Sequence, residues 1–131
     1  MTLRIFLLIT IFGINLNACN EAEEPELINE WKLIEQLMDP GDGSGTFQPV
    51  ISDKTIEFFS DGTVTSNGNL CTMSSASGTG SSGTYDGTEM IITADNCGVA
   101  IFEIRYELSG ENLILSYPCI EACREKYEAV D

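Results

Sequence analysis

The sequence predicts an all-β domain that closes into an eight-stranded antiparallel up-and-down barrel, preceded by an N-terminal signal peptide. From residue 30 onward, short runs of β-branched and aromatic residues alternate with turn residues. No stretch keeps a helical period of apolar residues for more than two turns. The connections between the runs are alternately tight and long, as expected when successive connections lie at opposite ends of a barrel.

The first expected element is a signal peptide over residues 1–18. Arg4 precedes an apolar core over residues 5–12, which is the layout of a secretory signal. This core is shorter than the roughly 20 residues needed to span a bilayer. The following Leu16-Asn17-Ala18-Cys19 resembles the bacterial lipobox. That resemblance implies that Cys19 becomes a lipidated mature N-terminus, and the alternative is an ordinary signal peptide cut near Ala18.

An acidic linker is expected over residues 19–29, because this segment is polar and charged. Several acyl chains on Cys19 would anchor the protein stably in a membrane. Glu21, Glu23 and Glu24 resemble an address for the outer face of the outer membrane. We therefore expect a lipid-anchored protein of the outer membrane, on its periplasmic or cell-surface face.

The remaining residues, 30–131, are expected to form one barrel domain. The clearest strand pattern is Phe102, Ile104, Tyr106 and Leu108, which alternate with charged residues so that one face is apolar and the other polar. The first expected strand, residues 31–38, could equally form a short helix. The expected strands cover residues 31–38, 54–59, 63–67, 83–86, 89–94, 101–108, 112–117 and 125–130.

Tight hairpins are expected at Asp61-Gly62, at Gly87 and at 109–111, with Asp-Gly favouring a type I′ turn. The long connections cover residues 39–53, 68–82, 95–100 and 118–124, and all of them would share one end of the barrel, the mouth.

Two of these long connections have unusual compositions. Residues 74–83 are nearly all Ser and Gly, which predicts a mobile loop. Asp39 and Asp42 belong to a segment, residues 39–45, that superficially resembles a calcium loop. It lacks the third acidic ligand and the terminal Glu, so a flexible turn is expected instead.

Four cysteines, Cys71, Cys97, Cys119 and Cys123, lie in the barrel domain. An even number in a small exported chain favours disulfides over metal ligands. Zinc is disfavoured because the chain has no histidine and no close Cys-x-x-Cys pair. We favour pairing Cys71 with Cys97 and Cys119 with Cys123. All four would lie at the mouth, so the other connectivities stay open.

Three segments together resemble the small lipocalin-like domain of bacterial lipid-anchored proteins. They are Glu30-Trp31-Lys32-Leu33, the hairpin over residues 54–64, and the late hairpin over residues 108–115. The resemblance covers residues 30–130. It implies a closed eight-stranded meander whose cavity, if present, takes small apolar molecules. A fold shared by proteins of many functions says more about architecture than about activity.

Binding of a small apolar molecule would use the inward faces of the strands. An eight-stranded barrel encloses room either for packed side chains or for one small ligand, so a filled core is the alternative. In that case the protein would be a non-enzymatic interaction or structural protein of the cell envelope, with the mouth loops as its contact surface. The candidate ligand-lining residues are Trp31, Ile56, Phe58, Tyr85, Ile92, Phe102, Tyr106, Leu115 and Tyr117.

Several functions are disfavoured by composition. The chain carries 21 acidic and 6 basic residues, for a net charge of −15, which argues against nucleic acids and anionic surfaces as partners. Without histidine the usual Ser-His and Cys-His nucleophile pairs cannot form, and the carboxylates on the strands alternate outward. We therefore expect no enzyme, no catalytic residue, no metal and no cofactor.

Overall fold

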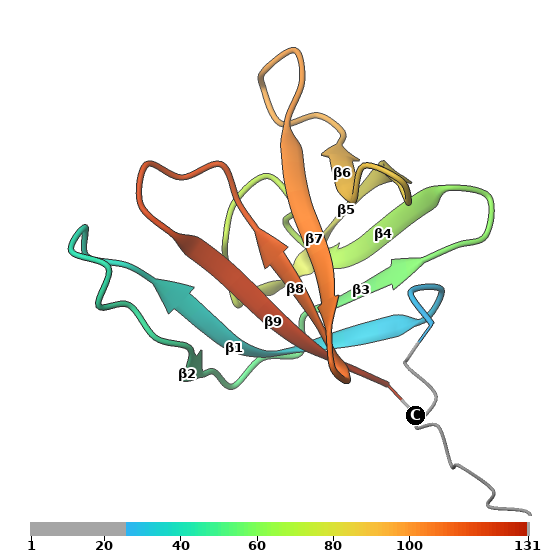
Figure 1. Ribbon diagram of the computed structural model, residues 1–131. Helices are drawn as coiled ribbons and strands as arrows, with labels where there is room; N and C mark the ends of the chain where they lie inside the picture. The colour runs from blue at the N-terminus through green and yellow to red at the C-terminus, as the bar shows by residue number, and fades with distance from the viewer. Residues whose placement is uncertain (1–25, 131) are drawn as a thin grey trace, which may run out of the picture.

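The strands of residues 26–130, the part of the chain that the computed structural model describes, follow one another around a single antiparallel sheet (Figure 1). β1 and β9, the first and last strands, also pair with each other, so the sheet closes. The predicted eight-stranded up-and-down barrel is confirmed, with the two-residue β2 paired to β1 as an addition. The strands are β1 (Glu30–Met38), β2 (Gln48–Pro49), β3 (Thr55–Phe58), β4 (Thr63–Gly68), β5 (Ser77–Asp86), β6 (Ile91–Ala94), β7 (Glu103–Ser109), β8 (Asn112–Ser116) and β9 (Cys123–Ala129).

The closure between β1 and β9 runs the full length of both strands, from the pair Trp31 and Ala129 to the pair Met38 and Cys123. On its other edge β1 is shared between two strands. Its first three residues pair with β3, and Glu35 and Gln36 pair with β2. The first run is therefore a strand and not a helix, because both of its edges are hydrogen-bonded to neighbours.

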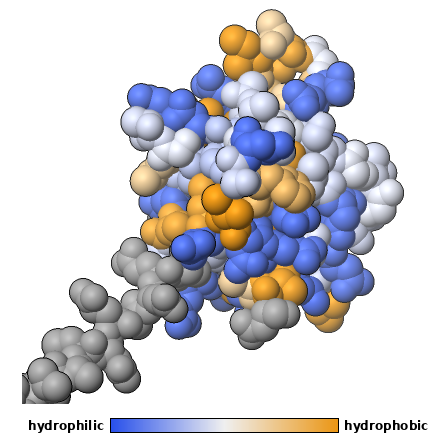
Figure 2. Space-filling model, turned by 90° about the vertical axis from the view of Figure 1, so that its right-hand side faces the viewer, coloured by the Kyte–Doolittle hydropathy of each residue, from blue (hydrophilic) through white to orange (hydrophobic). Residues whose placement is uncertain are grey.

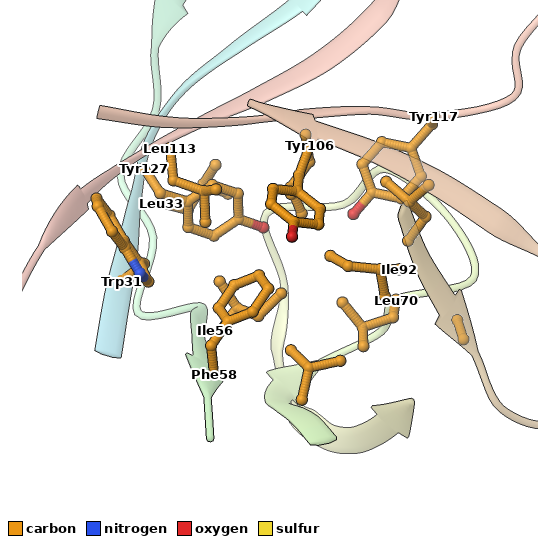
Figure 3. Close-up of a cluster of buried hydrophobic side chains, with 14 of the residues drawn as sticks. Trp31, Leu33, Ile56, Phe58, Leu70, Ile92, Tyr106, Leu113, Tyr117 and Tyr127 are labelled. Carbon is orange, nitrogen blue, oxygen red and sulfur yellow. The ribbon is translucent and has the colours of Figure 1, made fainter. Parts of the chain in front are cut away.

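The barrel interior is filled by side chains from alternate positions of the strands (Figure 3). Three aromatic rings meet close to the tight hairpin turns, with ring centroids 5.1 Å apart for Phe58 and Tyr85 and 5.7 Å apart for Phe58 and Tyr106. The buried apolar core comprises Trp31, Leu33, Ile56, Phe58, Val64, Leu70, Ile92, Ala94, Ile104, Tyr106, Leu113, Leu115, Tyr117, Cys123 and Tyr127.

The connections separate by length, as the sequence predicts. Residues 59–62, 87–90 and 110–111 turn at one end, and the long connections lie at the mouth. The described chain also enters and leaves at the tight-turn end, where the N–H of Val130 donates to the carbonyl of Glu30. Leu27 and Asn29, which we assigned to the linker, contact the barrel at this end. The indole N–H of Trp31 donates to the Leu27 carbonyl. The backbone N–H of Phe58 donates to the Asn29 carbonyl.

Two expectations about loops are wrong. Residues 74–83 are not all loop, because β5 begins at Ser77 and pairs with β4 from there. Ser and Gly suit this strand since it lies close to its neighbours: a Cβ on Gly83 would come within 2.4 Å of the Thr93 carbonyl oxygen. The turn at Asp61-Gly62 is not type I′, because only Gly62 has a positive φ, of 86°.

Strand bounds differ elsewhere by a few residues. Residues 89–90 belong to the turn before β6, where Met90 has a φ of 56°, and residues 101–102 precede β7. The segment 39–45 is ordered by its own hydrogen bonds: the Asp39 carboxylate accepts from the N–H groups of Gly41, Gly43 and Gly45 at 2.7–3.0 Å. The segment is thus a turn held by its own hydrogen bonds, and its flexibility stays a prediction.

The signal peptide over residues 1–18, the lipidation site Cys19 and the linker up to residue 25 lie outside the described residues. Among residues 26–130, no helix is long and apolar enough to cross a membrane.

Candidate functional site: the barrel mouth

A buried ion pair lies just inside the mouth of the barrel. The Lys54 ammonium donates to both carboxylate oxygens of Glu125, at 3.1 and 3.0 Å. Both side chains have an exposed fraction of 0%. Lys54 directly precedes β3, and Glu125 points inward from β9 between Cys123 and Tyr127. Charges this deep are tolerated only when paired and hydrogen-bonded, so the neighbouring groups matter.

Four further groups complete the hydrogen bonding of the Glu125 carboxylate. Oε1 accepts from the side-chain amide of Gln36 at 3.0 Å and from the N–H of Ser74 at 2.9 Å. Oε2 accepts from the hydroxyls of Tyr117 and Tyr127, at 2.8 and 2.5 Å. We refer to Lys54, Glu125, Tyr117, Tyr127, Gln36 and Ser74 as the polar cluster.

The third Lys54 hydrogen bond goes to the Ser74 carbonyl, at 3.0 Å. Among the described residues, every buried side-chain nitrogen and oxygen has a hydrogen-bond partner. Each buried polar side-chain atom of the polar cluster therefore has a hydrogen-bond partner within the protein.

The protonation of the polar cluster follows from its burial. Burial lowers the pKa of Lys54, and the charge of Glu125 opposes this effect. Burial raises the pKa of both Tyr117 and Tyr127 well above the ordinary value, and nearby Glu125 reinforces the shift. At neutral pH both phenols therefore keep their protons and act as hydrogen-bond donors to the carboxylate.

The connection between β4 and β5, residues 69–76, closes the mouth over the polar cluster; we call it the mouth loop. Leu70 is fully buried in the core and Met73 packs against it. Ser74 contributes both its N–H and its carbonyl to the ion pair. The Ser52 hydroxyl donates to the Ser75 carbonyl at 2.7 Å. The mouth loop is thus held by apolar contacts and by hydrogen bonds to charged groups.

Two disulfides brace the mouth and confirm the favoured pairing. Cys71 is bonded to Cys97, with Cα atoms 5.2 Å apart, which ties the mouth loop to the β6–β7 connection. Cys119 is bonded to Cys123, with Cα atoms 6.1 Å apart, which closes the β8–β9 connection on itself.

Large apolar side chains remain exposed on the rim around this closed mouth. Ile120 is fully exposed within the disulfide-closed β8–β9 connection, and Met38 has an exposed fraction of 73%. Val99 and Ile101 are exposed on the β6–β7 connection, which projects at the top of Figure 1. Figure 2 shows hydrophobic side chains gathered on that same projection. We call Met38, Val99, Ile101 and Ile120 the apolar rim.

A shallow hollow of about 250 Å³ opens beside the apolar rim. Its walls combine Met38, Met73, Phe102, Tyr117 and Pro118 with both disulfides. A larger hollow of about 410 Å³ lies beside β7 and shares Phe102, Tyr117 and Pro118 with the first, and another of about 600 Å³ lies beside β5. These spaces open to solvent and lie outside the packed barrel interior.

The nine candidate ligand-lining residues fall into two groups. Tyr85 and Phe102 are partly buried and pack against the core, and Phe102 also lines the 250 Å³ hollow. The others are buried in the core: Trp31, Ile56, Phe58, Ile92, Tyr106, Leu115 and Tyr117. Of these, Tyr117 belongs to the polar cluster and also lines the 250 Å³ hollow. Contact of these residues with a ligand stays a prediction.

Sequence reasoning missed Lys54 and Glu125. A signal was available for both. Glu125 lies between Cys123 and Tyr127 on the inward face of β9, and Lys54 shares the face of Ile56 and Phe58 in the expected strand over residues 54–59. Among residues 26–130, no group of three or more His, Cys, Asp or Glu side chains is placed to hold a metal ion. The Asp39 carboxylate is engaged by backbone N–H groups, which lower the pKa of Asp39.

Comparison of the chain with protein-family models, with curated protein sequences and with solved structures yields no match.

Proposed function

We propose that this protein is a lipid-anchored, lipocalin-like lipoprotein of the cell envelope whose filled barrel presents a rigid mouth to a protein partner. The observation that carries the proposal is the packed interior. Side chains occupy the barrel from Trp31 at one end to the polar cluster at the other, and the mouth loop covers them. What the mouth offers to other molecules is therefore its outer rim.

The apolar rim supports a protein contact. Its four large apolar side chains are exposed at the mouth end of the barrel, and exposed apolar surface is a common feature of interaction sites. The two disulfides restrict the loops that carry Ile120 and Val99, so less conformational entropy is lost when a partner binds. The described chain begins at the opposite end of the barrel, so an N-terminal anchor at Cys19 would leave the rim facing away from the membrane.

Photo-crosslinking in the native cell tests this proposal. A photoreactive residue at Ile120 should give a specific protein adduct, whereas one at Glu111, in the β7–β8 turn at the opposite end, should not. Replacing Val99 with Ser should reduce the adduct from Ile120 at least several-fold. Equal adducts from both positions, or none from Ile120, would contradict a rim contact.

A second candidate function, binding of a small apolar molecule, is favoured by the hollow that Met38, Met73 and Phe102 help to line. Its volume of about 250 Å³ lies just below the low end of ligand pockets, about 300 Å³. Native mass spectrometry of protein purified from its own cells should then show a bound molecule. Met73→Trp, which fills the hollow, should remove that mass without affecting the crosslink from Ile120.

A further inference from the structure

Two arginines flank one serine on the outer wall of the barrel. β7, β8 and β9 are neighbouring strands (Figure 1), and their register places Arg105 opposite Ser116 and Ser116 opposite Arg124. All three side chains point outward, because both chain neighbours of each are buried in the barrel. We call these three residues the arginine row.

The spacing of the arginine row lets both guanidiniums reach the same group. Directly opposite Cβ atoms in a sheet are about 5 Å apart, so the Cβ atoms of Arg105 and Arg124 lie about 10 Å apart with Ser116 between them. An arginine side chain is long enough to cover half of that distance. A single group placed over the Ser116 hydroxyl can therefore contact both arginines.

Neither arginine forms an ion pair within the described chain. Among residues 26–130, all three lysines have a carboxylate oxygen within 4 Å of the ammonium, whereas neither guanidinium does. This contrast arises in a chain with 21 acidic residues. The ion pairs are Lys32–Asp53, Lys54–Glu125 and Lys126–Glu35. The two guanidiniums, whose planar donors match a carboxylate, thus remain available to another molecule.

A hollow connects the arginine row to the apolar rim. Arg105 and Ser116 line the hollow of about 410 Å³, and Ile101 of the apolar rim lines it together with Phe102 and Pro118. Toward the tight-turn end, all three residues of the arginine row line a further hollow of about 310 Å³. A molecule that contacts the apolar rim can therefore extend along this outer wall to both arginines.

Carboxylates around the arginine row restrict what it can bind. Glu103 and Glu107 lie on the same face of β7 as Arg105, two residues before and after it, and each lines one of the two hollows. Glu89 also lines the hollow toward the tight-turn end. Any further negative charge on a bound molecule would be repelled by these groups. The site therefore suits one carboxylate with apolar neighbours, and it disfavours a run of acidic residues or a phosphate dianion.

We propose that the protein partner places a single acidic side chain, flanked by apolar residues, between Arg105 and Arg124. This inference rests on the proposed function, in that the occupant is a protein that contacts the apolar rim. The Ser116 hydroxyl can donate to the same carboxylate. Charged contacts of this kind fix the register of an interface more than they raise its affinity. The net charge of −15 repels anions at long range, but physiological salt screens exposed charges beyond about 8 Å.

A short peptide serves as the probe. Ser-Leu-Glu-Leu-Ser, acetylated and amidated, carries one carboxylate between two apolar side chains. Added to the isotope-labelled full chain at physiological salt, it should shift the NMR signals of Phe102 and of the arginine row. A matched peptide with Gln in place of Glu should bind about fivefold more weakly.

Arginine variants test the carboxylate contact directly. Arg105→Gln and Arg124→Gln should each weaken binding of the Glu peptide about fivefold and leave binding of the Gln peptide unchanged, which is the coupling that a double-mutant cycle measures. Arg105→Lys keeps the charge but loses the planar donors, so it should bind the Glu peptide with intermediate affinity.

Lys32→Gln is the matched control, because it removes one exposed positive charge from a different row, where Lys32 lies opposite Glu128. The preference for the Glu peptide should persist in this variant. An equal loss of preference in Lys32→Gln would overturn the proposal, as would equal binding of both peptides to the unmodified chain. Tighter binding of a peptide with Lys in place of Glu would assign the site to the surrounding glutamates and also overturn it.

Crosslinking in cells separates this inference from the proposed function. Combining Arg105→Gln with Arg124→Gln should reduce the adduct from Ile120 several-fold, and Lys32→Gln should not. An adduct that persists at full strength in the double variant would overturn the acidic contact and leave the rim contact intact. If Ile120 gave no adduct in the unmodified protein, the proposed function would fail, whereas the preference for Glu over Gln would still support the carboxylate site.

Discussion

The buried pair of Lys54 and Glu125 is the residue-level feature on which the mouth depends. Each charge is desolvated, and each is satisfied largely by the other and by Ser74 of the mouth loop. Removing one partner leaves an uncompensated charge in the core, which costs more than the pair itself contributes.

We therefore expect Lys54→Met to lower the free energy of unfolding by about 3–5 kcal/mol. The control is Lys32→Met, because the Lys32 ammonium is exposed and lies 3.9 Å from an exposed Asp53 carboxylate. Such a surface pair contributes at most about 1 kcal/mol. Urea denaturation measures both variants, and equal losses in the two would contradict the structural role of the buried pair.

The two tyrosines of the polar cluster predict a loss of stability at alkaline pH. The pKa of each is raised in the folded chain, so their contribution is fully present below the unfolded value of about 10 and is lost as the pH rises above it. Phenolate absorbance from Tyr117 and Tyr127 should thus appear only as the barrel unfolds. Tyr127→Phe should reduce that cooperative step, and smooth ionisation of all tyrosines in folded protein would refute the prediction.

The sequence could not reveal this cluster in full. Alternation marks Glu125 as inward-facing, and Lys54 shares the face of Ile56 and Phe58 in the expected strand over residues 54–59. Ser74, however, contributes main-chain groups, which carry no side-chain signature. By contrast, the inward positions of Trp31, Phe58 and Tyr106 follow directly from alternation along their strands.

At the level of elements, β5 shows why close approach demands glycine. A Cβ at Gly83 would lie 2.4 Å from the Thr93 carbonyl oxygen, closer than real contacts allow. At Gly83 the glycine that suggests a mobile loop reflects instead the close approach of β6, whereas a Cβ at Gly78 would meet nothing within 4 Å. Which strand lies alongside is a tertiary fact that local composition does not encode.

Gly83→Ala should accordingly destabilise the barrel by about 1–3 kcal/mol, because β5 and β6 must move apart. Gly87→Ala is the matched control, since a Cβ there meets nothing closer than the Tyr106 hydroxyl at 4.0 Å. Thermal melts of both variants give the comparison. An unchanged melting temperature for Gly83→Ala would show that β5 and β6 can move apart without loss of stability.

The two disulfides should differ in their contributions. Chain-entropy arguments give about 3.5 kcal/mol for Cys71–Cys97, which encloses the longer segment, and about 2 kcal/mol for Cys119–Cys123. Two double Cys→Ser variants, each lacking one disulfide, are compared by urea denaturation. The variant without Cys71–Cys97 should lose more free energy of unfolding than the variant without Cys119–Cys123. The reverse order would indicate that loop closure does not dominate their effect.

At the level of the whole molecule, the sorting of connections by length was predictable from sequence alone, because tight and long connections alternate along the chain. The brief pairing of β2 with β1 was not, since Gln48 and Pro49 have no strand pattern of their own. β2 is a strand only because it pairs with the neighbouring edge of β1.

With an anchor at Cys19, this arrangement predicts how the barrel is oriented. Asp42 lies in the connection between β1 and β2, at the mouth, and Asp61 lies in a turn at the opposite end. In the lipidated protein on vesicles, a fluorophore at Asp42 should lie farther from the bilayer than one at Asp61, as measured by energy transfer to labelled lipids. A shorter distance from Asp42 would reverse the orientation.

The pairing of β1 with β9 has a mechanical consequence. Suppose that the chain is held by its N-terminal segment and that a force is applied at the rim. The force then acts parallel to β1, along the paired edges of β1 and β9, which we call the seam. The hydrogen bonds of that seam are then strained together in shear and cannot open one at a time. The barrel should resist such traction far better than a pull that peels β9 from its C-terminal end.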